Sequence, residues 1–290
     1  MKTLLRLLAR VCFRFRAFNP EVLSTPGPVL LVPNHVSWLD WLFLAVVLDD
    51  DWKFVTSSTT ARTSWVLHRV MVNRRTFPVD NASPYAVRAM AEHLQAGGRL
   101  VLFAEGRITL TGSLMKVYDG TGFLIRQSGA KVITCYLRGA ARGRFVRHHG
   151  WTRWLPRVTA HFSDALTAPE FPGLSNATAR AKVTTWLRDR MTRQQFDAEM
   201  AFGPQNLLAA VCETAANIPH RVALEDVSFQ ELTYRRLLVG AEVLATEWRR
   251  RLGSATGERI GILLPNINAQ PVALLSLWAA RKVPAMLNYS

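Results

Sequence analysis

The sequence predicts an α/β protein in which the first two thirds of the chain form one domain around a largely parallel sheet. Short apolar runs bounded by turn residues alternate with segments whose apolar residues recur at helical spacing. This alternation is typical of a parallel sheet covered by helices. The length of 290 residues fits about two domains. With 49% hydrophobic and 20% charged residues, the chain is not of a disordered, collagen-like or fibrous class.

The first domain is expected to begin with the run PVLLVP, a short apolar strand with proline at both ends. Similar runs predict further strands, and the segments between several of them predict helices. The expected strands cover residues 28–33, 52–57, 99–104, 131–137 and 157–162. The expected helices cover residues 37–48, 61–72, 84–95, 118–128 and 176–200.

A proline and glycine break at Phe202-Gly203-Pro204 predicts a domain boundary. Beyond it we expect helices over 207–216, 233–252 and 270–281, with strands over 259–264 and 283–288. The apolar stretch 260–280 contains two prolines and several amides, so a buried strand and helix explain it better than a membrane span. An α/β pattern of this length that ends on a strand is typical of the start of a larger domain. We therefore divide the chain into residues 1–26, 27–200 and 201–290.

The N-terminal segment has the pattern of a basic amphipathic helix. Lys2, Arg6, Arg10 and Arg14 recur every four residues and form one stripe, with apolar residues largely on the other side. Such a helix is expected to lie in a membrane interface, because it is too short and too interrupted to span a bilayer. An ordinary packing helix with a solvated charged face is the alternative.

The charge balance points to anionic partners. The chain has 36 lysines and arginines against 21 acidic residues, a formal net charge of +15. Between Gly120 and Ser163 there are eight basic residues and no acidic one, with Trp151 and Trp154 among them. This stretch fits an anionic membrane surface, an acidic carrier protein or a solvated loop. Nucleic acid is not expected, because no nucleic-acid-binding motif accompanies the basic residues.

Three scattered cysteines form no CxxC pair, so neither a disulfide framework nor a structural zinc site is expected, and a reducing compartment fits. The chain also has no GxSxG motif, which weighs against a serine hydrolase.

The strongest chemical motif follows the first strand, where α/β sheets place ligand-binding groups. It reads Asn34-His35-Val36-Ser37-Trp38-Leu39-Asp40. Residues five apart do not share a helix face, so His35 and Asp40 meet only if His35 lies in the turn and Asp40 in the first helical turns. The pair then forms the orienting half of a catalytic triad, with His35 as the general base and the nucleophile a hydroxyl of the substrate. A histidine with purely structural hydrogen bonds at a helix start is the alternative.

A second motif follows the strand over 99–104 and joins an acidic residue, a glycine and basic residues. It begins Phe103-Ala104-Glu105-Gly106-Arg107 and continues to Lys116. Glycine beside arginine, with hydroxyls and a lysine close behind, suits a bound phosphate. Glu105 can accept a hydrogen bond from a substrate hydroxyl or hold the arginine.

Together the two motifs resemble the glycerolipid acyltransferase family, whose hallmarks are a His-x-x-x-x-Asp block and a later Phe-Pro-Glu-Gly block. The chain is further similar to bacterial bifunctional proteins that join a 2-acylglycerophosphoethanolamine acyltransferase to an AMP-forming acyl-acyl-carrier-protein synthetase. The similarity rests on the runs PNHVSWLD, EGRITLTGSLMKVYDGTGF, GERIGILLPN and VPAMLNYS. It implies a glycerolipid acyltransferase-like domain followed by the incomplete first part of a synthetase domain.

The resemblance implies that His35 is the general base, Asp40 its partner, and Glu105, Gly106 and Arg107 part of the acceptor site. Where the family often has Pro-Val-Asp-Arg, this chain has Pro78-Val79-Asp80-Asn81, and Ala104 replaces the family's proline. The first departure leaves one phosphate contact unassigned, with Arg74, Arg75 or Lys116 as substitutes.

The implied reaction moves a fatty acyl group from a thioester of acyl carrier protein or coenzyme A to a lysophospholipid, with lysophosphatidylethanolamine as the expected acceptor. It needs no cofactor, and no metal is expected. ATP and Mg²⁺ would serve only a complete synthetase domain, whose phosphate loop and lid do not occur before Ser290. The expected location is the cytoplasmic face of a bacterial inner membrane, peripherally bound. The alternative is a non-catalytic membrane- or carrier-binding remnant of the bifunctional enzyme.

Overall fold

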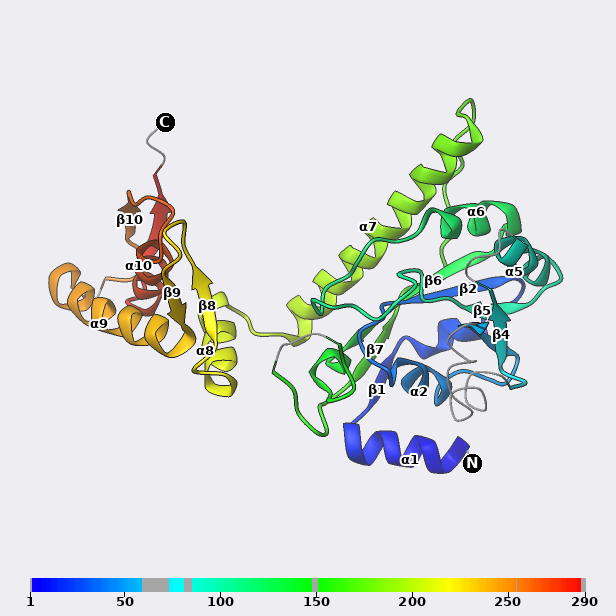
Figure 1. Cartoon of the computed structure of the whole chain (residues 1–290), viewed down its shortest axis with the longest axis horizontal. Helices are drawn as coiled ribbons and strands as arrows, with labels where there is room; N and C mark the ends of the chain where they lie inside the picture. The colour runs from blue at the N-terminus through cyan, green and yellow to red at the C-terminus, as the bar shows by residue number, and fades with distance from the viewer. Residues whose placement is uncertain (1, 59–72, 81–84, 148–150, 254, 288–290) are drawn as a thin grey trace. The chain divides into compact units, whose positions relative to one another are not determined.

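The computed structural model describes residues 2–58, 73–80, 85–147, 151–253 and 255–287. The chain forms two compact units, Met1–Phe202 and Gly203–Ser290, each with its own core. Figure 1 shows the helices and strands of each unit. The helix expected over 61–72 and Asn81 lie outside the described residues.

The first unit is built on a seven-stranded sheet, and the predicted largely parallel α/β architecture is confirmed. The strand order is β1-β7-β6-β2-β5-β3-β4. Parallel pairing joins β6, β2, β5, β3 and β4, whereas β7 runs antiparallel to β6 and pairs in parallel with β1. The strands are β1 (Arg16–Phe18), β2 (Val29–Pro33), β3 (Trp52–Ser57), β4 (Thr76–Val79), β5 (Arg99–Val101), β6 (Lys131–Arg138) and β7 (Thr159–Phe162).

Helices cover both faces of this sheet, as Figure 1 shows. The helices are α1 (Lys2–Phe13), α2 (Asp40–Ala45), α5 (Tyr85–Gln95), α6 (Asp119–Ser128) and α7 (Asn176–Phe202), with short 3-10 helices at Pro20–Ser24 and Ala140–Arg142. Successive residues of β2 point to opposite faces, so Val29 and Leu31 join one core and Leu30 and Val32 the other.

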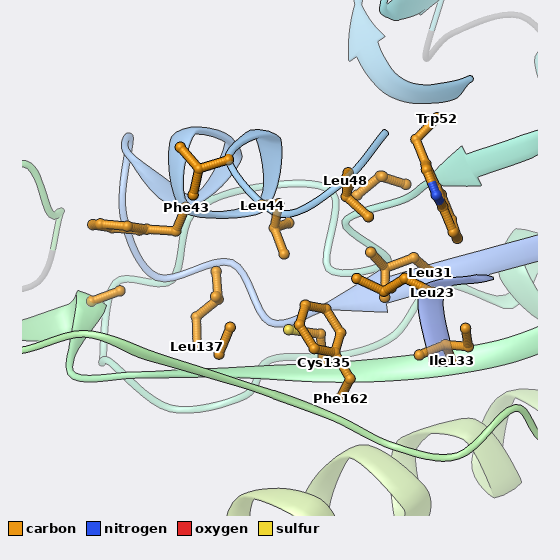
Figure 2. Close-up of a cluster of buried hydrophobic side chains, with 14 of the residues drawn as sticks. Leu23, Leu31, Phe43, Leu44, Leu48, Trp52, Ile133, Cys135, Leu137 and Phe162 are labelled. Atoms are coloured by element: carbon orange, nitrogen blue, oxygen red, sulfur yellow. The ribbon is translucent and has the colours of Figure 1, made fainter. Parts of the chain in front are cut away.

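The core on the first face lies between the sheet and helices α1 and α2. Figure 2 shows Phe43 of α2 above Leu137 of β6, and Leu48, which follows α2, above Leu31 of β2. Phe13 and Phe15 also pack against Phe43, with ring centroids 5.1 and 5.6 Å away. These contacts fix the start of α2 over the carboxyl end of β2.

The core on the second face lies under α5, α6 and α7. Gly122 lets α6 approach α7 closely, because a Cβ atom there would lie 2.5 Å from the carbonyl oxygen of Arg180. Helix α7 supplies Val183, Leu187 and Met191 to this core.

The second unit contains three helices and two pairs of strands among its described residues. Its elements are α8 (Leu207–Asn217), β8 (Val222–Glu225), β9 (Glu231–Thr233), α9 (Tyr234–Leu252), β10 (Arg259–Ile262), α10 (Ala269–Ala279) and β11 (Val283–Met286). β8 and β9 are antiparallel, whereas β10 and β11 are parallel. Leu237, Ala241 and Leu275 form a small core between α9 and α10.

Several element bounds differ from those expected. Helix α2 begins at Asp40 rather than at residue 37, because residues 35–39 wrap around the Asp40 carboxylate. Strand β5 ends at Val101 rather than at 104, and β7 begins at Thr159 rather than at 157. Strands β1, β4, β8 and β9 were not predicted. β4 contains Pro78, and proline is tolerated there because β4 lies at the sheet edge.

Candidate active site

His35 and Asp40 lie together at the carboxyl end of the central strand β2. The Nδ1 atom of His35 is 2.9 Å from Oδ2 of Asp40. The same oxygen accepts the backbone N–H groups of Val36 at 2.7 Å and Ser37 at 2.9 Å. An oxygen that already accepts two N–H donors also acts as an acceptor towards the imidazole. This arrangement places the histidine proton on Nδ1 and leaves Nε2 with its lone pair.

The loop before α2 explains how residues five apart come into contact. Asp40 is the first residue of the helix, and Leu39 is its N-cap. His35 therefore lies in the turn, as the spacing requires, and the chain between the two residues curls back over the carboxylate. Asn34 anchors the start of this turn, because its Oδ1 accepts the backbone N–H of Leu137 in β6 at 2.7 Å.

Asp40 is fully buried, and its charge is held by a few directed hydrogen bonds. Burial raises the pKa of Asp40 above its ordinary value, and the hydrogen bonds from His35, Ser37 and Val36 oppose that rise. Its other oxygen, Oδ1, has no hydrogen-bond partner among the described residues. A buried carboxylate aimed at an imidazole suits the stabilisation of an imidazolium, because the low surrounding polarity strengthens the attraction.

The His35 ring is accessible on the side away from Asp40. Its side chain is 21% exposed, and Nε2 forms no hydrogen bond to a described residue. The ring stacks on Phe103, with centroids 4.1 Å apart. Trp38 and Trp41 are 48% and 41% exposed near the same turn. The ring is thus fixed by one carboxylate and one aromatic neighbour, with its basic nitrogen open to a substrate.

Glu105 links the two motifs through backbone hydrogen bonds. Its Oε1 accepts the N–H of His35 at 2.7 Å, and its Oε2 accepts the N–H of Met115 at 2.8 Å. The residue is 1% exposed, and burial raises the pKa of its carboxyl group while these two bonds oppose the rise. Glu105 therefore clamps the histidine turn to the 105–116 loop.

Gly106 and Arg107 follow directly, and both are exposed. Gly106 has a φ of +67°, and a Cβ atom there would meet the Tyr118 ring at 2.9 Å. Both requirements favour glycine. The Arg107 side chain forms no ion pair or hydrogen bond with a described residue and is exposed, so it is free to bind an anion.

Thr109 supports the same loop from inside. It is buried, its N–H donates to the His35 carbonyl at 2.9 Å, and its hydroxyl contacts Ser113 and the N–H groups of Thr111 and Gly112. The two motifs are therefore joined at both the N–H and the carbonyl of His35. Asn34, Phe103 and Thr109 were part of the motifs, but their supporting roles were not predicted, since each depends on contacts between distant strands.

The remaining basic candidates lie elsewhere. Arg74 and Arg75 precede β4, at the amino ends of the parallel strands. His35 follows the carboxyl end of β2, so it lies at the opposite end of the strands. Arg75 is also engaged at the amino ends, because its guanidinium donates to the carbonyls of Leu48 and Asp49 and pairs with Asp50. From the amino ends of the strands, neither arginine can supply the phosphate contact that Asn81 leaves unassigned.

Lys116 and Asp80 of the Pro78-Val79-Asp80 block lie towards the carboxyl ends of the parallel strands, as His35 does. Asp80 follows the carboxyl end of β4. Lys116 is exposed and lines a groove of about 360 Å³ with Arg188 of α7. Arg107 and Lys116 both belong to the 105–116 loop that Glu105 fastens to the His35 turn, and Arg107 directly follows the glycine turn at Gly106. Within the described residues, no group of three or more histidine, cysteine or acidic side chains is placed to hold a metal ion.

Known proteins share features with this domain. Residues 14–138 match the family model described as Acyltransferase, so this segment carries the pattern of an acyltransferase domain. It contains His35, Asp40, Glu105, Gly106, Arg107 and Lys116. Among solved structures, the 1-acyl-sn-glycerophosphate (LPA) acyltransferase PlsC from Thermotoga maritima is similar, with a TM-score of 0.49 and 15% identity over 67% of this chain and 79% of that chain. The family match ends before the second unit, whose interpretation as the start of a synthetase domain stays a prediction.

Proposed function

We propose that the chain is a glycerolipid acyltransferase that moves a fatty acyl group from a thioester to the free hydroxyl of a lysophospholipid. One observation carries the proposal most directly. A histidine at the carboxyl end of the central strand holds its Nδ1 against a buried carboxylate and keeps Nε2 open. The acyltransferase match over residues 14–138 supports the same reaction type.

In the proposed reaction, Nε2 of His35 takes the proton from the acceptor hydroxyl. The hydroxyl oxygen then forms a bond to the thioester carbonyl carbon, and the carbon–sulfur bond breaks. The imidazolium returns its proton to the departing thiolate, so the products are an ester and a thiol. Asp40 stabilises the imidazolium between these steps. General acid–base catalysis contributes about 10²–10⁴-fold, and positioning of the substrates supplies much of the rest.

The acceptor is proposed to be lysophosphatidylethanolamine, with its phosphate at Arg107. Arg107 is exposed, next to a glycine turn, and on the loop that Glu105 fastens to His35. Guanidinium groups bind phosphate through paired donors. The donor is proposed to be the thioester of acyl carrier protein or coenzyme A, both of which are anionic and complement a chain of net charge +15.

We also propose that the protein works at the cytoplasmic face of a bacterial inner membrane. No described helix has the length and apolar character needed to cross a bilayer. The proposal instead depends on α1, where Leu4, Leu7, Leu8 and Val11 are exposed while Ala9 is buried against the domain. An exposed apolar row on a basic helix is typical of interfacial binding.

The experiment combines the purified chain, a labelled acyl donor and lysophosphatidylethanolamine, with no ATP. Wild type is compared with His35→Ala, and both donors and lysophosphatidic acid are tested in parallel. Diacyl product that is lost in the variant, at an unchanged melting temperature, supports the proposal. Folded wild type that forms no product with either donor or acceptor overturns it and favours the non-catalytic remnant.

A further inference from the structure

Five arginines surround a groove of about 950 Å³ that the proposed reaction does not use. Its floor is apolar and includes Phe15 and Val46. The groove lies along α1 and β1, on the sheet face that α1 and α2 cover. The arginines are Arg6, Arg10, Arg14, Arg16 and Arg157.

No acidic side chain neutralises these arginines in the described part of the chain. Among the described residues, their side chains form one hydrogen bond, from Nε of Arg6 to the Val46 carbonyl at 2.6 Å. Elsewhere in the chain, exposed arginines form ion pairs, as Arg193 does with Asp197 and Arg249 with Glu242. Like charges around one concave surface repel each other, and a bound anion offsets that repulsion. The groove therefore has the charge of an anion site.

The neighbouring surface of α1 indicates which anion fits. Leu4, Leu7, Leu8 and Val11 follow the helical spacing i, i+3, i+4, i+7 and are 61%, 58%, 48% and 69% exposed. They form a leucine–valine ridge on the same helix that supplies Arg6 and Arg10 to the groove. Apolar side chains next to arginines match the acyl chains and phosphates of a membrane interface. A soluble anion would leave the ridge in water.

We propose that this arginine groove binds the phosphate groups of anionic phospholipids while the leucine–valine ridge enters the bilayer. The groove also faces the correct end of the sheet for this purpose. Arg16 pairs with Thr159, and Thr159 pairs with Arg138 at the carboxyl end of β6, which lies beside β2. Arg16 and Arg157 thus lie at the sheet end that carries His35. Lipid bound there holds the candidate active site at the membrane surface.

The role given to this groove rests on the proposed function, because it assumes an enzyme that acts on membrane lipids. Lipid binding itself is measured without any acyl transfer. The probes are vesicles of phosphatidylcholine with and without phosphatidylglycerol, and binding is followed by co-sedimentation. The groove variant carries Arg10→Gln and Arg157→Gln. The control carries Arg126→Gln and Arg190→Gln, which remove the same charge from exposed positions on α6 and α7, on the opposite face of the sheet.

Each basic residue at an anionic surface contributes about fivefold to binding, so the groove variant is expected to bind phosphatidylglycerol vesicles on the order of 20-fold more weakly. The control is expected to lose less than about threefold, since its arginines contribute only long-range attraction. A third variant, Leu7→Gln with Val11→Gln, is expected to lose binding to both kinds of vesicle. All three should transfer acyl groups normally to a monomeric short-chain acceptor, which separates this test from that of the proposed function.

Three results would overturn the lipid site. Equal losses in the groove and control variants would show a general effect of net charge. Loss of binding to an acidic carrier protein, with vesicle binding unchanged, would assign the groove to a protein partner. Competition by inorganic phosphate at concentrations that leave ionic strength unchanged would identify a site for soluble anions.

Discussion

The backbone N–H of His35 donates a 2.7 Å hydrogen bond to the carboxylate of Glu105, seventy positions further along the chain. The other carboxylate oxygen accepts the N–H of Met115. Both oxygens are therefore occupied by backbone donors, and the side chain is 1% exposed. Glu105 belongs to the frame that positions His35, although its motif suggested a contact with substrate.

Replacing Glu105 with glutamine should reduce both stability and turnover. One carboxylate oxygen becomes an NH₂ group that faces a backbone N–H, so a charge-assisted hydrogen bond is lost and two donors oppose each other. We expect a loss of about 2 kcal/mol in the free energy of unfolding. A small displacement of His35 should lower kcat about 10- to 100-fold. Denaturation and steady-state kinetics measure the two effects.

Glu170→Gln is the control for this change, because Glu170 is exposed and has no hydrogen-bond or ion-pair partner among the described residues. It should leave stability and kcat unchanged. If Glu105→Gln has normal stability but a higher KM for the acceptor, Glu105 contacts the substrate instead of only positioning His35.

Asp40→Asn tests the charge on Asp40 separately from its hydrogen bonds. The amide oxygen of asparagine can accept from His35, Val36 and Ser37 as Oδ2 does, but it carries no charge to stabilise the imidazolium. We expect kcat to fall by about 10²–10⁴-fold while the melting temperature changes little. Asp189→Asn, at an exposed position on α7, is the control. Full activity in Asp40→Asn would mean that His35 does not become charged during turnover.

Much of the sheet and the His35–Asp40 contact could be predicted from local patterns. Buried parallel strands are nearly continuous apolar runs, so β2 and β6 are visible in the sequence. The turn that brings Asp40 back to His35 also follows from their spacing, because a continuous helix would keep them apart.

The role of Glu105 could not be predicted in the same way. Its partners, His35 and Met115, are set by the pairing of β2 with β5, and the residue types alone do not contain that pairing. The position of Arg75, one of three candidate substitutes for the unassigned phosphate contact, could not be predicted for a similar reason. Arg75 lies at the amino end of β4, which the sequence did not predict. Pro78 within Thr76–Val79 argues against a strand there.

Gly106→Ala tests the turn that carries Arg107, with Gly173→Ala as the control. Both glycines have positive φ, +67° and +78°, but a Cβ atom at Gly173 would have no neighbour within 4 Å, whereas one at Gly106 would meet the Tyr118 ring. The control should lose about 1–2 kcal/mol from backbone strain alone. Gly106→Ala should lose about 1 kcal/mol more and should raise the KM for the acceptor, since Arg107 is displaced. Equal losses and unchanged kinetics would show that the loop absorbs the extra carbon.

Removal of the second unit should leave acyl transfer intact if the cut follows Phe202. The Phe202 ring lies 4.8 Å from Phe18 and 5.0 Å from His161, and Glu199 accepts hydrogen bonds from Tyr136 and Arg138. A cut at the expected boundary, residue 200, would remove both contacts of the Phe202 ring. A chain ending at Phe202 should be active and folded, whereas one ending at Ala198 should unfold at a lower temperature. Loss of activity in the longer piece would show that the second unit contributes to the site.

His161 should make the first unit less stable in acid. It is 8% exposed, its Nε2 lies 2.8 Å from the Thr159 hydroxyl, and burial, with a smaller effect of Arg138, lowers its pKa to about 4. The unfolded chain binds a proton near pH 6.5, so between that pH and about 4 it holds more protons than the folded chain, and stability falls as the pH falls. This group alone accounts for up to about 3 kcal/mol. Urea denaturation of the chain ending at Phe202 should show that His161→Gln flattens the slope across this range. A slope equal to that of wild type would mean that the folded protein protonates His161 as readily as the unfolded chain does.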